Sequence, residues 1–227
     1  NRVLKLEGGP PPADRARLLA TYEAGLASTG ARLWTRRVRL LEDLQPRFGE
    51  AFAAIHGEAG DQPEGGDSGR ALPATLHYAC RLGEVPAAER EEALRAALLE
   101  RRTLDQQRGS TSMGPHRDDL RVELDGQLAG DFASQGQSRA LVLAFKLAEV
   151  QAAREHDQAP PLLLLDDVSS ELDPRRTALL FRTLGQQAGQ CLLTTTSPRF
   201  IDLPAQVRSR CFRVERGTVT ADEDAPG

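Results

Sequence analysis

The feature that most constrains the fold is the segment at residues 161–173, which reads PLLLLDDVSSELD. Four consecutive leucines are typical of a strand buried on both faces, as in a parallel sheet between layers of helices. Two carboxylates, Asp166 and Asp167, follow at once, although burying a charge costs free energy unless a partner compensates it. Because ligands of open α/β sheets bind beyond the carboxyl ends of the strands, the segment predicts both a fold class and the edge that carries its site.

The rest of the chain supports an α/β fold with a helical lobe at its start. Apolar residues three and four apart predict helices over residues 14–58, and Pro46 is expected to break or kink them. A loop rich in glycine and acidic residues follows, so we expect a helical lobe at residues 1–70 and a second domain at residues 71–227. Strands are predicted at 71–80, 161–167 and 190–196, two short strands around the Asp125-Gly126 turn within 118–132, a hairpin at 211–220, and helices at 86–108, 136–156 and 174–187. Strands alternating with helices indicate layers around a largely parallel sheet, with the strands 161–167 and 190–196 and the helix 136–156 buried.

Composition excludes several classes of protein. Aromatic residues make up only 4% of the 227 residues, which disfavours a protein that stacks single-stranded bases on aromatic rings. The net charge of −4 gives no global sign of nucleic-acid binding, although a local patch could still provide it. Three widely spaced cysteines (Cys80, Cys191 and Cys211) favour neither a disulfide framework nor a zinc site, and fit a reducing cytoplasm. No stretch approaches the length of a membrane span.

The paired carboxylates allow two interpretations. Asp166 and Asp167 could simply cap the turn and helix that follow, as aspartates after strands often do. Alternatively, Asp166 holds Mg²⁺ and Asp167 orients an attacking water, as at a phosphate-transfer site. A divalent cation shared with phosphates would explain why two charges stand at the end of an apolar strand.

Two neighbouring motifs are consistent with the second interpretation. Ser134-Gln135-Gly136-Gln137 precedes a helix, where a serine can act as N-cap and a helix N-terminus favours an anion. Downstream, Asp173 precedes Pro174 at a predicted helix start. Taken alone, a serine–glycine match of this kind is far more often the start of an ordinary capped helix, and a capped helix also explains Asp173.

Together these motifs carry a family resemblance. The order SQGQSR, then LLLLDDVSSELD, resembles the signature, Walker B and D-loop series of ABC-type ATPases. The upstream TSMGPHRDDL narrows the resemblance to the RecF family of bacterial recombination mediators, with CLLTTTS at the expected place. The motifs cover residues 70–215, and the helical opening matches by position only. The resemblance implies an ABC-type P-loop ATPase-like sheet with helices.

The resemblance implies a role for each part of the carboxylate segment. Asp166 would be linked to Mg²⁺, and Asp167 stands where most ABC ATPases have the catalytic glutamate. The shorter side chain of Asp167 implies slow hydrolysis, which suits a switch more than a motor. The dimer seam would be formed by Ser169, Ser170 and Asp173.

The resemblance also implies contacts to nucleotide. The γ-phosphate of ATP held by a second subunit would be reached by Ser134, Gln135, Gly136 and Gln137. Thr196 falls where many relatives carry a switch histidine. The resemblance therefore places Thr196 at the nucleotide site, but its side chain lacks the imidazole that would sense the γ-phosphate. His116 marks the family in GPHRDD, and we expect it to be a hydrogen-bonded turn residue.

The phosphate-binding loop GxxxxGK[ST] does not occur in the sequence. Relatives of this type carry it near the N-terminus, so the simplest hypothesis is the C-terminal part of a RecF-like protein. ATP and Mg²⁺ would then need the Walker A half, and this chain alone is expected not to bind ATP with micromolar affinity.

Arginines in the helical opening suggest a contact with DNA. Arg32, Arg36 and Arg39 share one helical face, which could bind the phosphates of a duplex. A solvated face balanced by Glu42 and Asp43 explains the same pattern equally well.

The leading interpretation is an ATP-dependent DNA clamp for repair and recombination. The resemblance implies an ATP-dependent homodimer that binds double-stranded DNA at gaps, helps to load RecA, and works with RecR- and RecO-type partners in the cytoplasm, away from membranes. One alternative is another SMC- or RecN-type repair ATPase, but the sequence lacks their long heptad arms. Another is a non-catalytic DNA-binding or interaction module that has kept the fold.

Overall fold

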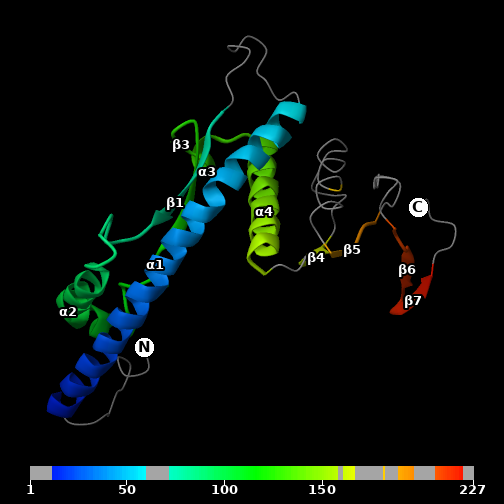
Figure 1. Ribbon diagram of the computed structural model, residues 1–227. Helices are drawn as coiled ribbons and strands as arrows, with labels where there is room; N and C mark the ends of the chain where they lie inside the picture. The colour runs from blue at the N-terminus through cyan, green and yellow to red at the C-terminus, as the bar shows by residue number, and fades with distance from the viewer. Residues whose placement is uncertain are drawn as a thin grey trace. The chain divides into compact units, whose positions relative to one another are not determined.

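The computed structural model describes residues 12–59, 72–157, 161–166, 181, 189–196 and 208–221, and Figure 1 shows it with most of its elements labelled. The helices are α1 (Pro12–Ala59), α2 (Arg90–Arg108), α3 (Ala129–Phe132) and α4 (Gln135–Asp157). The strands are β1 (Ala74–Ala79), β2 (Asp119–Leu124), β3 (Gln127–Leu128), β4 (Leu162–Leu165), β5 (Gln190–Leu193), β6 (Phe212–Glu215) and β7 (Thr218–Ala221). The predicted helices and strands are therefore found close to their expected positions, except the helix at 174–187, of which only Phe181 is described.

The fold is mixed α/β, and its described strands form three small sheets. The strand order of the first is β1-β2-β3, in which β2 and β3 run antiparallel. The second pairs β4 with β5 in parallel, and the third is the antiparallel β6–β7 hairpin. A largely parallel sheet was expected, but among the pairings of known direction in the described residues only β4–β5 is parallel. Short turns join β2 to β3 and β6 to β7, and such connections force antiparallel pairing.

Helix α1 continues through Pro46 over 48 residues, so of the two expected effects, a break or a kink, the break does not occur and the kink stays a prediction. A proline inside a helix removes one backbone hydrogen bond and costs roughly 3 kcal/mol. Buried side chains on both sides of it, Leu44 and Phe48, oppose that cost. Phe48 also packs edge-on against Phe145 of α4, with ring centroids 6.4 Å apart.

The turn between β2 and β3 has the conformation that its sequence predicts. Asp125 and Gly126 both have positive φ, 52° and 77°, as a two-residue hairpin turn requires. The second strand is shorter than expected, because β3 has only two residues and the chain then enters the one-turn helix α3.

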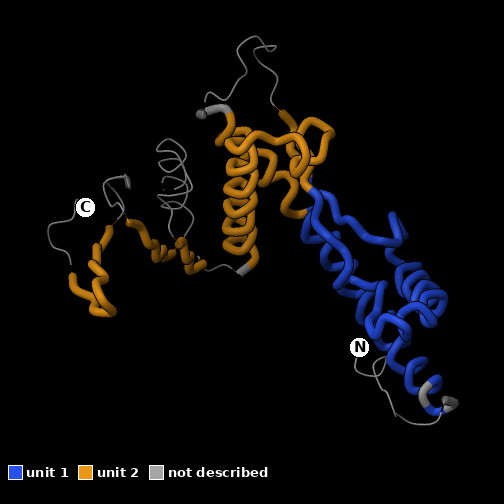
Figure 2. The backbone as a smooth tube through the Cα atoms, turned by 180° about the vertical axis from the view of Figure 1, so that it is seen from behind, with its two compact units in different colours: residues 1–42, 76–121 blue, residues 43–75, 122–227 orange. Residues whose placement is uncertain are grey.

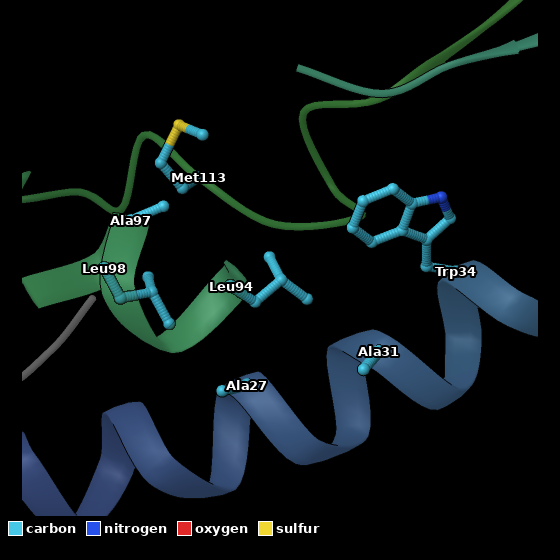
Figure 3. Close-up of a cluster of buried hydrophobic side chains, with 7 residues drawn as sticks. All are labelled: Ala27, Ala31, Trp34, Leu94, Ala97, Leu98 and Met113. Carbon is cyan, nitrogen blue, oxygen red and sulfur yellow. The ribbon is translucent and has the colours of Figure 1, made fainter. Parts of the chain in front are cut away.

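The chain divides into two compact units, coloured separately in Figure 2. One unit comprises residues 1–42 and 76–121, and the other comprises residues 43–75 and 122–227. The core of the first unit, shown in Figure 3, is formed by Ala27, Ala31, Trp34, Leu94, Ala97, Leu98 and Met113. Small residues on α1 allow α2 to approach closely: a Cβ on Gly30 would lie 3.3 Å from both Leu94 and Pro115.

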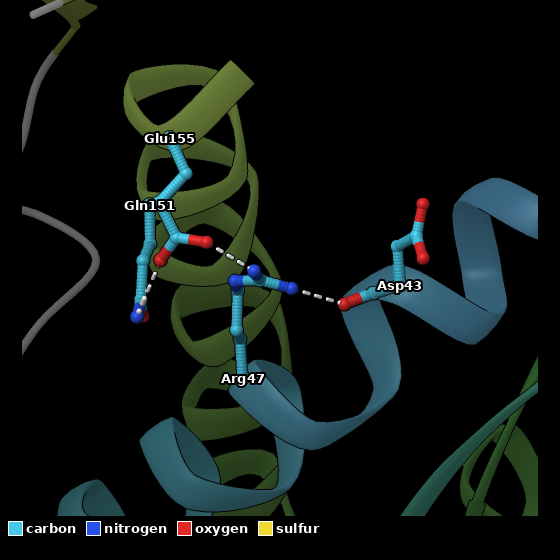
Figure 4. A network of polar contacts seen from close by, with 4 residues as sticks. All are labelled: Asp43, Arg47, Gln151 and Glu155. Atoms are coloured by element: carbon cyan, nitrogen blue, oxygen red, sulfur yellow. Dashed lines mark hydrogen bonds and ion pairs between the residues drawn. The ribbon is translucent and has the colours of Figure 1, made fainter. Parts of the chain in front are cut away.

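In the second unit, α1 and α4 are joined by the polar network of Figure 4. Arg47 pairs with Glu155 and also donates to the backbone oxygen of Asp43, while Gln151 donates to the other oxygen of Glu155 at 3.2 Å. Helix α4 is buried along most of its apolar length, as expected, with Val142 as an exposed exception.

Strand β4 is less buried than its leucines predict. Leu162 and Leu164 are 57% and 68% exposed, and Leu192 of β5 is exposed on the same face. The prediction of strands buried on both faces is thus wrong, because one face of the pair is exposed and the residues of the other face, Leu163 and Leu165 among them, are only half-buried.

Candidate functional site

The carboxyl ends of β4 and β5 bring Asp166 beside Thr194. The parallel register pairs Leu165 with Leu193, so the next residue of each strand lies at the same edge of the sheet. The backbone nitrogen of Thr194 donates to the oxygen of Leu165 at 2.9 Å. Its hydroxyl donates to Oδ1 of Asp166, whose carboxylate is exposed at the strand end. The first predicted carboxylate is therefore held by a threonine that sequence analysis did not single out.

The arrangement fits a magnesium ion shared with a nucleotide. Mg²⁺ is usually held by one or two carboxylates together with water and phosphate oxygens rather than by a dedicated protein cage. In the described part of the chain no three His, Cys, Asp or Glu side chains gather as a cage. Asp166 supplies one exposed carboxylate, and Thr196 lies exposed two residues beyond Thr194. The remaining predicted residues of this region lie outside the described residues: Asp167, Ser169, Ser170 and Asp173.

The start of α4 forms a reciprocal capping box. The backbone nitrogen of Gln137 donates to Oγ of Ser134 at 3.1 Å, and the backbone nitrogen of Ser134 donates to Oε1 of Gln137 at 2.9 Å. Ser134 is thus the N-cap that the sequence predicts. Gln135 is exposed and Gly136 is half-buried, so the first turn, with its unsatisfied N–H groups, is accessible. The side-chain oxygen of Gln137 is engaged in the cap, which leaves its amide nitrogen for any ligand.

The GPHRDD segment forms a hydrogen-bonded turn. Nε2 of His116 lies 3.2 Å from the hydroxyl and 3.3 Å from the backbone oxygen of Thr111. Its ring also lies against Gly114, where a Cβ would come within 3.2 Å and where φ is 126°. His116 is therefore a hydrogen-bonded turn residue, as expected. The loop is anchored from α2 by the buried carboxylate of Asp105, which accepts from the nitrogen of Ser112.

The same motif ties α1 to β1. Asp118 accepts a hydrogen bond from the hydroxyl of Tyr78 at 2.8 Å, and Arg37 donates to the oxygen of Pro115 at 2.5 Å. Burial raises the pKa of Tyr78 to about 12, so the phenol stays protonated and donates to Asp118. These contacts give GPHRDD a role in building the first unit.

Three arginines on α1 have no partner among the residues that the structure describes. Arg32, Arg36 and Arg39 are exposed, and within the described ranges no ion pair or hydrogen bond joins them to another residue, Glu42 and Asp43 included. By contrast, Arg37 of the same helix is engaged in the GPHRDD contacts.

The arginines line a shallow hollow beside the contact between α1 and α2. Its volume is about 320 Å³, and it is lined by Ser28, Ala31, Arg32, Thr35, Arg36, Arg39, Ala87, Ala88 and Glu91. The buried stripe of Ala27, Ala31 and Trp34 repeats at the same spacing as Arg32, Arg36 and Arg39. The two stripes are offset by five residues, or about 140° around the helix at about 100° per residue, so the basic stripe faces largely away from the buried one. Glu91, the acid of the hollow, is paired with Arg95 at 2.9 Å.

A search of the described helices for one long and apolar enough to cross a bilayer finds none.

Comparison with curated proteins gives consistent matches. The DNA replication and repair protein RecF of Anaeromyxobacter sp. strain Fw109-5 is 44% identical over 219 residues, covering 96% of this chain and 56% of the relative. RecF of Myxococcus xanthus is 42% identical over 214 residues, covering 91% and 53%. The chain therefore spans about half the length of the curated relatives it matches. No family model matches the chain.

Solved structures agree with these relatives. The structure of the recombination mediator protein RecF-ATPrS in the RecFOR pathway superposes with a TM-score of 0.73 at 26% identity, covering 97% of this chain and 53% of the other. The corresponding RecF-ATP structure gives a TM-score of 0.70 at 27% identity, with 97% and 52% covered.

Proposed function

Because this chain belongs to the RecF family, we propose that it forms part of an ATP-dependent DNA clamp acting in recombination and repair. It would supply the signature motif, the Mg²⁺-linked carboxylate edge and a surface for duplex DNA. In this proposal, residues 71–227 belong to an ABC-type ATPase domain and residues 1–70 to its helical lobe. The relatives whose names carry ATP or ATPrS support the choice of nucleotide.

The nucleotide chemistry is divided between two parts of the chain: the carboxyl ends of β4 and β5, and the start of α4. When bound, Mg²⁺ would neutralise the negative charge that develops on the phosphates. Asp166 holds the ion directly or through water, Asp167 orients the attacking water, and Thr196 lies near the nucleotide. The dimer seam is formed by Ser169, Ser170 and Asp173.

The signature motif at the start of α4 acts on nucleotide held by a second subunit. The capping box leaves the first turn of α4 exposed, so backbone N–H groups at Gln135 and Gly136, with the hydroxyl of Ser134, are available to the γ-phosphate. Gln137 contributes its amide nitrogen. ATP would thereby hold two copies of the protein together around DNA.

The observation that carries the DNA part of the proposal is that Arg32, Arg36 and Arg39 have no partner in the described part of the chain. A solvated face with acidic neighbours would be expected to show ion pairs, and none joins these arginines within the described residues. Three guanidinium groups over two helical turns match the repeated phosphates of a duplex, and such contacts release counterions.

Partners of the RecR and RecO type and a role in RecA loading at gapped DNA complete the proposal, supported by the RecFOR pathway named for the solved relatives.

The test is duplex binding as a function of salt. In the protein as its gene encodes it, the double variant Arg32→Glu/Arg39→Glu is expected to weaken binding to all sequences. The slope of log K against log salt should also fall by about 2, because two phosphate contacts are lost.

A matched control is available on α2. Arg101 and Arg108 are exposed and seven residues apart, as Arg32 and Arg39 are, so Arg101→Glu/Arg108→Glu makes the same change in net charge. Equal loss of affinity in the two double variants would mean that only net charge matters, and the proposed DNA surface would be abandoned.

A further inference from the structure

Thr194 is tied to Asp166 at both its backbone and its side chain. Its backbone nitrogen is hydrogen-bonded to Leu165, the residue before Asp166, and its hydroxyl donates to Oδ1 of Asp166 itself. We propose that Thr194 is a positioning residue that orients the Asp166 carboxylate for a divalent cation. This inference rests on the proposed function of Asp166 as the Mg²⁺-linked carboxylate.

The need for such a residue follows from the exposure of Asp166. An exposed aspartate at the end of a strand samples several side-chain rotamers, and each places its oxygens differently. Thr194 is β-branched, which restricts its own χ1 angle, and its backbone is fixed by the β4–β5 register. The hydroxyl is therefore a donor at a defined place, and it favours one orientation of the carboxylate.

The contact leaves the carboxylate able to bind a cation. An ionised aspartate has about four lone-pair sites, and the hydroxyl of Thr194 takes one of them. The others remain for a metal ion or its water ligands. Partners that hold a metal-binding side chain through a hydrogen bond typically change metal affinity by 10- to 100-fold when they are replaced.

The experiment measures metal binding rather than turnover. Mn²⁺ is titrated by electron paramagnetic resonance into the protein as its gene encodes it, with a slowly hydrolysed ATP analogue present. Thr194→Val keeps the shape and removes the hydroxyl, and it is expected to weaken Mn²⁺ binding by about 10-fold or more. Thr194→Ser restores the hydroxyl and should bring the affinity back to within about 3-fold of the parent, since serine is less constrained at χ1.

Two further variants make the result decisive. Thr218→Val, in the β6–β7 hairpin, is the same substitution at an exposed strand position and should leave Mn²⁺ affinity unchanged. Asp166→Asn tests the proposed function itself: if it does not alter Mn²⁺ binding, the assignment of Asp166 fails, and the role of Thr194 fails with it. If Asp166→Asn weakens binding while Thr194→Val does not, only the positioning role is overturned.

Circular dichroism of each variant shows whether it has folded. Should Thr194→Val not fold, Thr194→Ala removes the same hydroxyl with less bulk, and its Mn²⁺ affinity decides in the same way. A loss of affinity in Thr194→Val that Thr194→Ser fails to restore would indicate a packing effect and would also overturn the proposal.

Discussion

At the scale of single residues, the Arg47–Glu155 pair shows how one contact makes stability depend on pH. The hydrogen bond from Arg47 lowers the pKa of Glu155, and a second from Gln151 acts in the same direction. A carboxylate whose pKa is lower in the folded than in the unfolded state stabilises the fold above its unfolded pKa, about 4.3 for glutamate. That stabilisation disappears as the pH falls through the lowered folded pKa.

Glu155→Gln is therefore expected to lower the urea midpoint of unfolding at pH 7, and the difference from the parent should shrink as the pH falls below 4. The effect should be modest, because the pair is partly exposed and solvent screens it. Glu100→Gln, at an exposed position of α2, provides the control and should show no such convergence. A difference that persists unchanged at low pH would mean that packing, not charge, links Glu155 to Arg47.

At the scale of secondary structure, the capping box of α4 gives Ser134 two separable roles. As N-cap it accepts a hydrogen bond from Gln137, and in the proposed function its hydroxyl also contacts a phosphate. Aspartate caps helices as well as serine does, but its charge would repel a phosphate.

Ser134→Ala should therefore reduce the free energy of unfolding without nucleotide by about 1 kcal/mol, whereas Ser134→Asp should leave it nearly unchanged. Chemical denaturation followed by circular dichroism measures both. In the full gene product with ATP present, both variants should lose the proposed ATP-dependent dimer, which analytical ultracentrifugation detects. If the Ser134→Asp variant still forms a dimer when ATP is added, the proposed contact of Ser134 with a phosphate is excluded, whereas its role as N-cap is unaffected.

At the scale of the whole molecule, the proposed function is tested by whether ATP changes assembly on DNA. A clamp that opens on hydrolysis is trapped closed when the residue that orients the attacking water is replaced. A non-catalytic DNA-binding module would not respond to the same change.

In the protein as its gene encodes it, Asp167→Asn is expected to slow the dissociation of the ATP-bound dimer from duplex DNA by at least 10-fold, measured by fluorescence anisotropy after dilution. Asp131→Asn, an exposed aspartate of α3, is the matched control and should dissociate at the parent rate. Equal dissociation rates in the two variants would favour the non-catalytic module.

Much of the molecule could be predicted from the sequence, because its signals are local. The Asp125-Gly126 turn, the N-cap at Ser134 and the turn role of His116 each depend on residues within about five positions of one another. Strand and helix positions followed from hydrophobic periodicity for the same reason. The family also followed from four short motifs in order, and the curated relatives confirm it.

The remaining features depend on contacts between distant segments, which periodicity does not encode. The pairing of Thr194 with Asp166 depends on the register of β4 and β5. The packing of Phe48 against Phe145 supports the continuation of α1 through Pro46. The exposure of Leu164 shows the same limit: an apolar run predicts burial, but only the packed chain decides which face is covered. The sequence by itself thus determined the family, the elements and the residue types at the candidate site. Which polar groups meet, and which arginines find no partner among the described residues, depended on the tertiary structure, because those outcomes follow from the packing of segments far apart along the chain.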